Sequence, residues 1–147
     1  MKPTGPPDAA DTASAAPASN GYKSRGGLRR LWHALGYSWR GLGAACRHEA
    51  AFRQELALGL PALVLAWVVA PTSRDALWLS LAVLAVWVVE LLNSALEALA
   101  DAVSLDEHPL LGRAKDLGSA AVMLTLLGAV AVWLVVLGPV AARWWAG

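Results

Sequence analysis

The sequence has only one cysteine, Cys46, in 147 residues, which excludes an intrachain disulfide and gives no sign of an oxidised, secreted domain. It also lacks the GxxxxGK[ST] and GxGxxG loops of common nucleotide folds, and any CxxC pair. His33, His48 and His108 do not have the spacing of metal ligands. These absences exclude the familiar soluble nucleotide-binding and zinc-binding classes.

Charged residues are scarce, at 16% of the chain, and the net charge is only +1. By contrast, 57% of the residues are hydrophobic, the mean hydropathy is +0.49, and there are eight tryptophans. This composition predicts a membrane protein. The basic residues border apolar segments instead of forming a soluble patch, so no nucleic-acid partner is expected.

Three apolar segments are long enough to cross a hydrocarbon core of roughly 30 Å. Leu56 to Ser73 and Ala120 to Ala142 contain 18 and 23 residues without charge. The middle segment runs from Ala76 through several polar positions to Ala100. The predicted fold class is an all-α membrane protein with transmembrane helices at about residues 50–70, 76–100 and 118–142.

A surface helix over about residues 25–47 is predicted ahead of the first span. Apolar residues recur there at helical spacing and are opposed by arginines, a pattern typical of an amphipathic helix on a membrane surface. Residues 1–24 are rich in Pro, Ala, Ser and Thr and are predicted to be a disordered tail. Residues 25–147 would form the integral-membrane domain.

Positive charge is concentrated near the N-terminus, because eight of the twelve Lys and Arg residues precede the first span. The positive-inside rule then predicts a cytosolic N-terminus and, after three spans, a periplasmic C-terminus. The loop after the second span, with Arg113 and Lys115, would be cytosolic. Trp144 and Trp145 would anchor the far interface.

Glu90 is the most informative residue, because it follows fourteen uncharged residues in the middle segment. On a helix, Glu97 and Asp101 fall within about 20° of Glu90, with Asn93 beside them. A carboxylate near the bilayer centre costs roughly 2.5 to 3.5 kcal/mol, so such groups usually mark a site. A structural polar stripe between helices is the alternative, but three acids in register favour a function.

Depth along this helix separates the roles of the acids. At 1.5 Å per residue, Glu97 lies roughly 10 Å beyond Glu90, which puts Glu90 inside the inner leaflet and Glu97 near its surface. A buried carboxylate suits general-base work on a lipid-embedded group, whereas one at the interface can hold a cation or a soluble substrate. Glu49 can reach the depth of Glu97, or it can simply pair with Arg53 on one helix face.

A cationic cluster, Gly112 to Ser119, opens the third span and contains Arg113, Lys115 and Asp116. Cations beside the free N–H groups of a helix start form a ready phosphate site. Basic residues that flank a span are also ordinary topology signals. The cluster alone fits either interpretation.

Four blocks in order resemble the prokaryotic diacylglycerol kinase family, over a region from about Arg30 through the third span. They are GYSWRGL at 36–42, EAAFRQE at 49–55, ELLNSALE at 90–97 and GRAKDLGSAA at 112–121. The resemblance implies a homotrimeric integral-membrane kinase of the bacterial inner membrane, which phosphorylates diacylglycerol to phosphatidic acid. ATP would be the co-substrate and Mg²⁺ the cofactor.

The resemblance also implies roles for individual residues. Glu90 matches the general base, which contacts the lipid, and Asn93 its polar partner. Glu49 and Glu97 match the carboxylates that hold the nucleotide's metal. Glu107 departs from the family, which has an aromatic residue there. The other implied nucleotide contacts are Arg30, Tyr37, Asp106, His108, Lys115 and Asp116, and the other implied lipid contacts are Ser38, Trp39, Arg53, Glu55 and Ser119.

Two other functions remain open. A kinase for another lipid alcohol, such as undecaprenol, would use the same scaffold. Alternatively, the buried acids would serve proton or ion movement in a small transporter, although three spans without an internal repeat argue against that. Lipid-dependent ATP turnover by the purified protein separates a kinase from a transporter.

Overall fold

The computed structural model describes residues 27–146, which form four helices and no strand. The helices are α1 (Gly27–His48), α2 (Ala50–Val69), α3 (Ser73–Val103) and α4 (Pro109–Ala146). α2, α3 and α4 are each long and apolar enough to cross a membrane. The predicted all-α class with three membrane-length helices is therefore confirmed. The predicted disordered tail, residues 1–24, lies outside the described residues.

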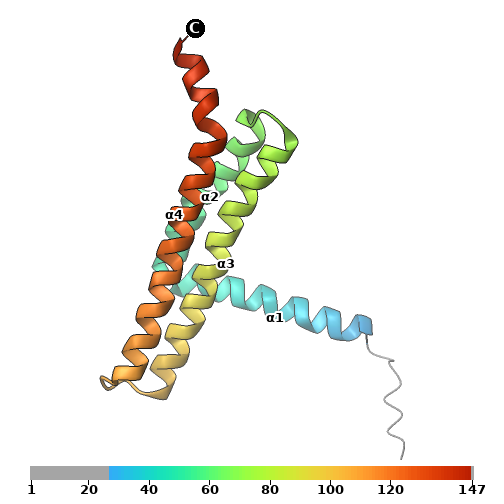
Figure 1. The fold of residues 1–147 in the computed structure, drawn as a ribbon. Coiled ribbons are helices and arrows are strands. Elements are labelled where there is room, and N and C mark those ends of the chain that lie inside the picture. Colours follow the sequence, from blue (N-terminus) through green and yellow to red (C-terminus); the bar gives the residue numbers. More distant parts are fainter. Residues whose placement is uncertain (1–26, 147) are drawn as a thin grey trace, which may run out of the picture.

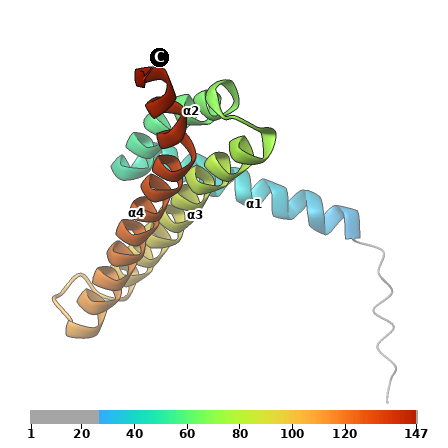
Figure 2. The same cartoon turned by 45° about the horizontal axis from the view of Figure 1, so that its top comes forward.

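The helix α3 packs against both α2 and α4 (Figure 1). The turn between α2 and α3 is at one end of the bundle, and the connection between α3 and α4 is at the other. α1 leaves the bundle sideways from the start of α2, as both views show (Figures 1 and 2). The helix bundle therefore has two distinct ends, and α1 points away from it.

One face of α3 is buried, and this face holds the bundle together. Leu79, Val83 and Val86 are buried on it, and they recur every three or four residues, as the side of a helix requires. Glu90 and Ser94 continue the same row and are also buried. The polar positions thus extend a hydrophobic packing face instead of lying on a separate side of α3.

The helices α2 and α3 pack tightly at Gly59. A Cβ atom at this position would lie 2.6 Å from Cζ2 of the Trp87 ring and 2.9 Å from Cγ1 of Val83. Glycine has no side chain and leaves this space to the ring. Trp87 Nε1 also donates a hydrogen bond to the backbone oxygen of Glu55, at 3.2 Å. This contact joins the middle of α3 to the first half of α2.

The connection between α3 and α4 is shorter than the gap between the predicted spans at 76–100 and 118–142. α3 continues to Val103 and α4 begins at Pro109, so only residues 104–108 connect them. Proline suits the first position of a helix because an N–H there would have no partner within the helix. Lys115 therefore lies in the second turn of α4, beyond the free N–H groups at its start. The prediction that the cluster from Gly112 to Ser119 opens the third span was therefore wrong.

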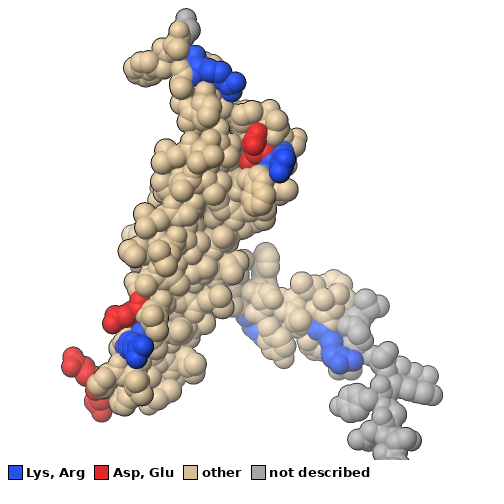
Figure 3. Space-filling model, in the orientation of Figure 1, with Lys and Arg blue, Asp and Glu red and all other residues tan. Residues whose placement is uncertain are grey.

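Charged side chains gather near the two ends of the bundle, with uncharged surface between them on the face that Figure 3 shows. α4 contributes much of the apolar surface, because none of its residues is buried within the chain. Leu124, Leu127 and Val135 of α4 are among the exposed hydrophobic residues. Such a belt of apolar surface is what contact with lipid, or with other membrane-spanning helices, requires.

Candidate functional site

Glu90 is the one charged residue that is buried among those the structure describes, with an exposed fraction of 4%. It follows Val86 on the packing face of α3 and precedes Ser94, which is 9% exposed. An ionised carboxylate loses hydration in such a position, at a cost of several kcal/mol unless other groups compensate. Its burial against α3's neighbours therefore calls for a functional or structural reason.

Other glutamates lie close enough for their charges to act on Glu90. These are Glu97, from the same helix, and Glu49, which directly precedes α2. Glu55 of α2 is in turn affected by the charge of Glu90. The fold thus brings four acids from two chain segments into one region. Their negative charges repel one another, and a bound cation would relieve this repulsion.

The acids suit a magnesium ion only in part. In the described part of the chain, no three His, Cys, Asp or Glu side chains converge closely enough to hold a metal by themselves. Carboxylate oxygens are nevertheless the protein ligands that Mg²⁺ prefers, and it commonly takes one or two of them together with water and substrate phosphate. One or two of these carboxylates would therefore be enough for a metal that arrives with phosphate groups.

Asn93 connects these acids to α4. Its Nδ2 donates a hydrogen bond to Oε1 of Glu97, at 3.0 Å, while its Oδ1 is buried without a hydrogen-bond partner. A Cβ atom at Gly118 of α4 would collide with this same Oδ1. Glycine at 118 therefore lets α4 approach Asn93 closely. An unpaired buried acceptor costs stability, so Asn93 calls for a functional or structural explanation.

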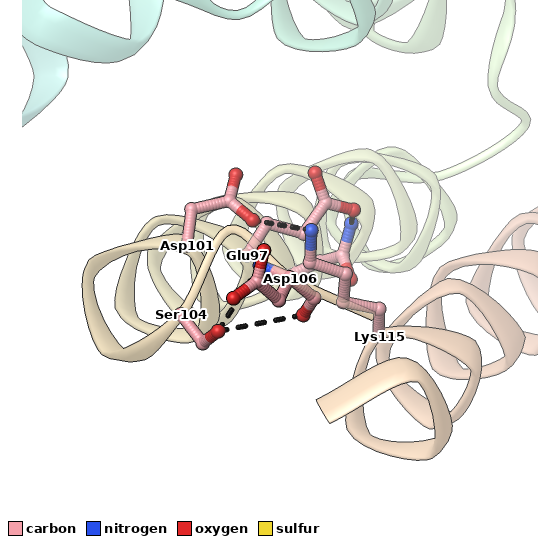
Figure 4. A network of polar contacts seen from close by, with 6 residues as sticks. Glu97, Asp101, Ser104, Asp106 and Lys115 are labelled. Atoms are coloured by element: carbon pink, nitrogen blue, oxygen red, sulfur yellow. Dashed lines mark hydrogen bonds and ion pairs between the residues drawn. The ribbon is translucent and has the colours of Figure 1, made fainter. Parts of the chain in front are cut away.

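Lys115 lies close to the same acids. Its Nζ donates to Oδ1 of Asp101 at 2.5 Å, which joins α4 to α3 (Figure 4). The side chains are 40% and 53% exposed, so such a pair contributes at most about 1 kcal/mol to stability. The charge of Glu97 also acts on the Lys115 ammonium. The ion pair therefore holds the Lys115 ammonium near Glu97. Because the pair is weak, Lys115 can leave Asp101 at little cost in free energy.

The connection between α3 and α4 forms a hollow of about 520 Å³, which Asp106, His108 and Lys115 line. The N–H of Asp106 donates to Oγ of Ser104 at 3.1 Å (Figure 4). Nδ1 of His108 accepts the N–H of Leu110 at 3.3 Å and so caps the start of α4. Three of the predicted nucleotide contacts therefore share one hollow.

A larger hollow, of about 970 Å³, lies between α1 and α3. The predicted lipid contacts Ser38 and Trp39 line it together with Glu49 and Ser94. Oγ of Ser38 donates to the backbone oxygen of Ala34, at 3.1 Å. An apolar surface of α1 and the carboxylate-bearing residue Glu49 therefore line the same hollow.

Arg53 does not pair with Glu49. Its Nη1 donates to the backbone oxygen of Arg47 at 3.1 Å, which satisfies a carbonyl in the last turn of α1. Among the described residues, Lys115 and Asp101 form the one ion pair. The simple ion-pair explanation for Glu49 is therefore wrong.

Some predicted contacts are not brought to these hollows. Arg30 and Tyr37 are exposed on α1, where Arg40 lies 4.8 Å from the centre of the Tyr37 ring. Asp116 and Ser119 are exposed on α4. None of these four side chains lines either hollow.

Three residues of the site region were not predicted from the sequence. Asp101 was placed on the same side of the helix as Glu90 and Glu97 but was not assigned a role, although it is the partner of Lys115. Gly118 lies in the predicted cluster, but no local pattern indicates that it faces Asn93. Trp87 stands inside an apolar run, where an aromatic residue gives no signal of a polar contact.

Comparisons with known proteins agree with this arrangement. Residues 36–137 match the family model described as prokaryotic diacylglycerol kinase. The chain is 47% identical over 104 residues to the diacylglycerol kinase of Escherichia coli (strain K12), covering 70% of this chain and 84% of that protein. It is 45% identical over 106 residues to that of Pseudomonas aeruginosa (strain PAO1), covering 71% and 85%.

A more distant relative, the diacylglycerol kinase of Helicobacter pylori (strain 26695), is 41% identical over 104 residues, which cover 69% of this chain and 79% of that protein. The matched region contains the buried Glu90, the acids around it and the Lys115–Asp101 pair. It excludes the last turns of α4. The chain therefore belongs to the prokaryotic diacylglycerol kinase family.

Proposed function

We propose that this protein transfers the γ-phosphate of ATP to the hydroxyl of diacylglycerol, at the inner face of the bacterial inner membrane. The products are phosphatidic acid and ADP. The observation that carries this proposal is the buried carboxylate of Glu90 on an apolar packing face, which suits a reaction on a lipid-embedded hydroxyl. Relatives that match over about 70% of the chain are named diacylglycerol kinase.

Glu90 is the proposed general base. Its carboxylate takes the proton of the lipid hydroxyl while the hydroxyl oxygen attacks the γ-phosphorus, and the bond to the bridging oxygen of ADP breaks. Asn93 is the proposed polar partner, since its buried Oδ1 has an acceptor position to offer. Little else is required of the protein, because phosphoryl transfer depends mainly on positioning and charge stabilisation.

Glu90, Glu97 and Asp101 form an acidic row along α3. The nucleotide is proposed to bind at the Glu97 end of this row, away from Glu90. Glu49 and Glu97 would hold Mg²⁺, which would supply neutralisation of the phosphate charge. Lys115 exchanges Asp101 for a phosphate oxygen, and the low energy of their exposed pair permits this. The proposal also includes Arg30, Tyr37, Asp106, His108 and Asp116 as nucleotide contacts.

The lipid approaches along α1 and the apolar helices. α1 is the proposed amphipathic surface helix, with the N-terminus cytosolic and the C-terminus periplasmic. Its Leu31, Trp32 and Leu35 are exposed in the single chain and suit contact with lipid. The proposed lipid contacts are Ser38, Trp39, Arg53, Glu55 and Ser119.

A homotrimer is expected in mild detergent. α4 buries no residue within its own chain, so close packing against other subunits is available to it. Light scattering corrected for bound detergent should give three chains per particle. A monomer with full kinase activity would contradict the proposed assembly.

Lipid-dependent ATP turnover tests the function directly. The purified protein should release ADP with diacylglycerol in mixed micelles, and turnover should fall to background when the lipid is omitted. Undecaprenol at the same mole fraction is the matched comparison, and a faster rate with it would reassign the substrate. Equal ATP turnover with and without any lipid alcohol would overturn the proposal of a lipid kinase.

A further inference from the structure

We propose that Trp87 is a positioning residue for the candidate base, Glu90. Gly59 of α2 leaves the space that the Trp87 ring needs for this role. Trp87 precedes Glu90 by three residues, so both lie on the same side of α3. The inference rests on the proposed function, because it concerns the placement of Glu90 during that reaction. The apolar contact between Trp87 and Gly59 would thereby affect the chemistry at Glu90.

The contact between Trp87 and α2 has two parts. The indole N–H donates to the backbone oxygen of Glu55 at 3.2 Å. Among the described residues, this is the one hydrogen bond that joins a side chain of α3 to α2. The ring meanwhile fills the space beside Gly59, where a Cβ would lie 2.6 Å from Cζ2 and 2.9 Å from Cε2. The position of α2 relative to α3 is thus defined both along the helix and across it.

This contact lies where it can affect the acids. The hydrogen-bond acceptor is the backbone of Glu55, whose side chain is close enough to be affected by the charge of Glu90. Glu49 precedes Glu55 by six residues and lies directly before the same helix. A shift of α2 against α3 would therefore change the separation of Glu90 from both acids. Misplacement of a reacting group by about 1 Å can cost about 100-fold in rate.

Trp87→Phe is the central test, because it removes the N–H donor. The smaller ring of phenylalanine also lacks the Cζ2 and Cε2 atoms beside Gly59, so part of the packing contact is lost with the hydrogen bond. We expect kcat with diacylglycerol to fall at least about threefold to tenfold, the factor that one net hydrogen bond represents. The KM for Mg-ATP should stay within about twofold, because the change affects the placement of the base more than nucleotide binding. Trp67→Phe is the matched control, since Trp67 lies on α2 with 61% of its surface exposed.

Gly59→Ala tests the same contact from the side of α2. The added methyl group meets the Trp87 ring, and kcat should fall by about tenfold or more. In a Trp87→Leu background the ring is absent, so most of the further loss from Gly59→Ala should disappear. Gly128→Ala is the matched control, because a Cβ at Gly128 meets no atom within 4 Å.

Coupling to the base distinguishes positioning from a structural role. Glu90→Asp retracts the carboxylate by one methylene, so Trp87→Phe should cost less in that background than in the wild type. A structural role would instead lower the yield or thermal stability and multiply the losses in the double variant. Losses that multiply in this way would overturn the positioning role.

The outcomes separate this inference from the proposed function. An active wild type with Trp87→Phe and Gly59→Ala at wild-type kcat overturns the positioning role alone. A rise in the KM for Mg-ATP without a fall in kcat also overturns it. A wild type without lipid-dependent turnover overturns the proposed function, and the positioning role with it.

Discussion

Replacing Glu90 with glutamine is expected to remove most of kcat while leaving the fold and Mg-ATP binding nearly intact. A general base contributes about 100-fold to 10,000-fold to a rate, and glutamine cannot accept the proton. Folding should tolerate the change, because a neutral amide at a position that is 4% exposed carries less desolvation cost than a carboxylate. The measurements are steady-state kinetics with diacylglycerol in mixed micelles and calorimetric titration with Mg-ATP.

The matched control is Asp75→Asn, which makes the same chemical change in the first turn of α3, far along the helix from Glu90. Its kcat should equal that of the wild type. Activity near wild type in Glu90→Gln would show that another group accepts the proton. Loss of nucleotide binding in the same variant would instead place Glu90 on the nucleotide side of the site.

Glu97→Gln is expected to weaken Mg-ATP binding as well as turnover. A carboxylate that holds the metal supplies a negative charge that glutamine lacks, and we expect a loss of roughly 10-fold to 100-fold in apparent affinity. The hydrogen bond from Asn93, at 3.0 Å, can persist because the amide oxygen of glutamine still accepts. The variant therefore separates loss of charge from loss of the local contact.

The Mg²⁺ requirement is the most direct measurement for Glu97→Gln. Turnover should need a higher Mg²⁺ concentration, and titration at saturating Mg²⁺ should recover part of the activity. Unchanged Mg-ATP affinity in Glu97→Gln, together with lost affinity in Glu90→Gln, would reverse the assignment of metal ligand and base.

Much of the fold could be predicted from composition and spacing alone. The apolar segments are long, and backbone groups in lipid must be satisfied within a helix, so helices of membrane length were the expected result. The row formed by Glu90, Glu97 and Asp101 follows from the helical repeat, because residues seven and eleven positions apart return to one side. The family resemblance could likewise be recognised from blocks of local sequence.

Some local features were harder to predict. Helix ends depend on a few capping contacts, and the third apolar helix starts at Pro109, well before its apolar run. His108 caps this start through Nδ1, an arrangement that hydrophobic patterning does not indicate. The alternative pairing of Glu49 with Arg53 required only four residues of helix, but Glu49 lies just before α2 in an extended conformation. Arg53 was thereby free to reach the end of α1.

By itself, the sequence determined the class of protein, the three membrane-length helices and the acidic row, because each depends on residues close together in the chain. Only the tertiary structure decided which segments meet across helices. It paired Lys115 with Asp101, seated Gly118 against Asn93 and fitted the Trp87 ring beside Gly59. These contacts depend on the relative rotation and depth of packed helices, and every apolar helix offers several faces that a linear pattern leaves equivalent.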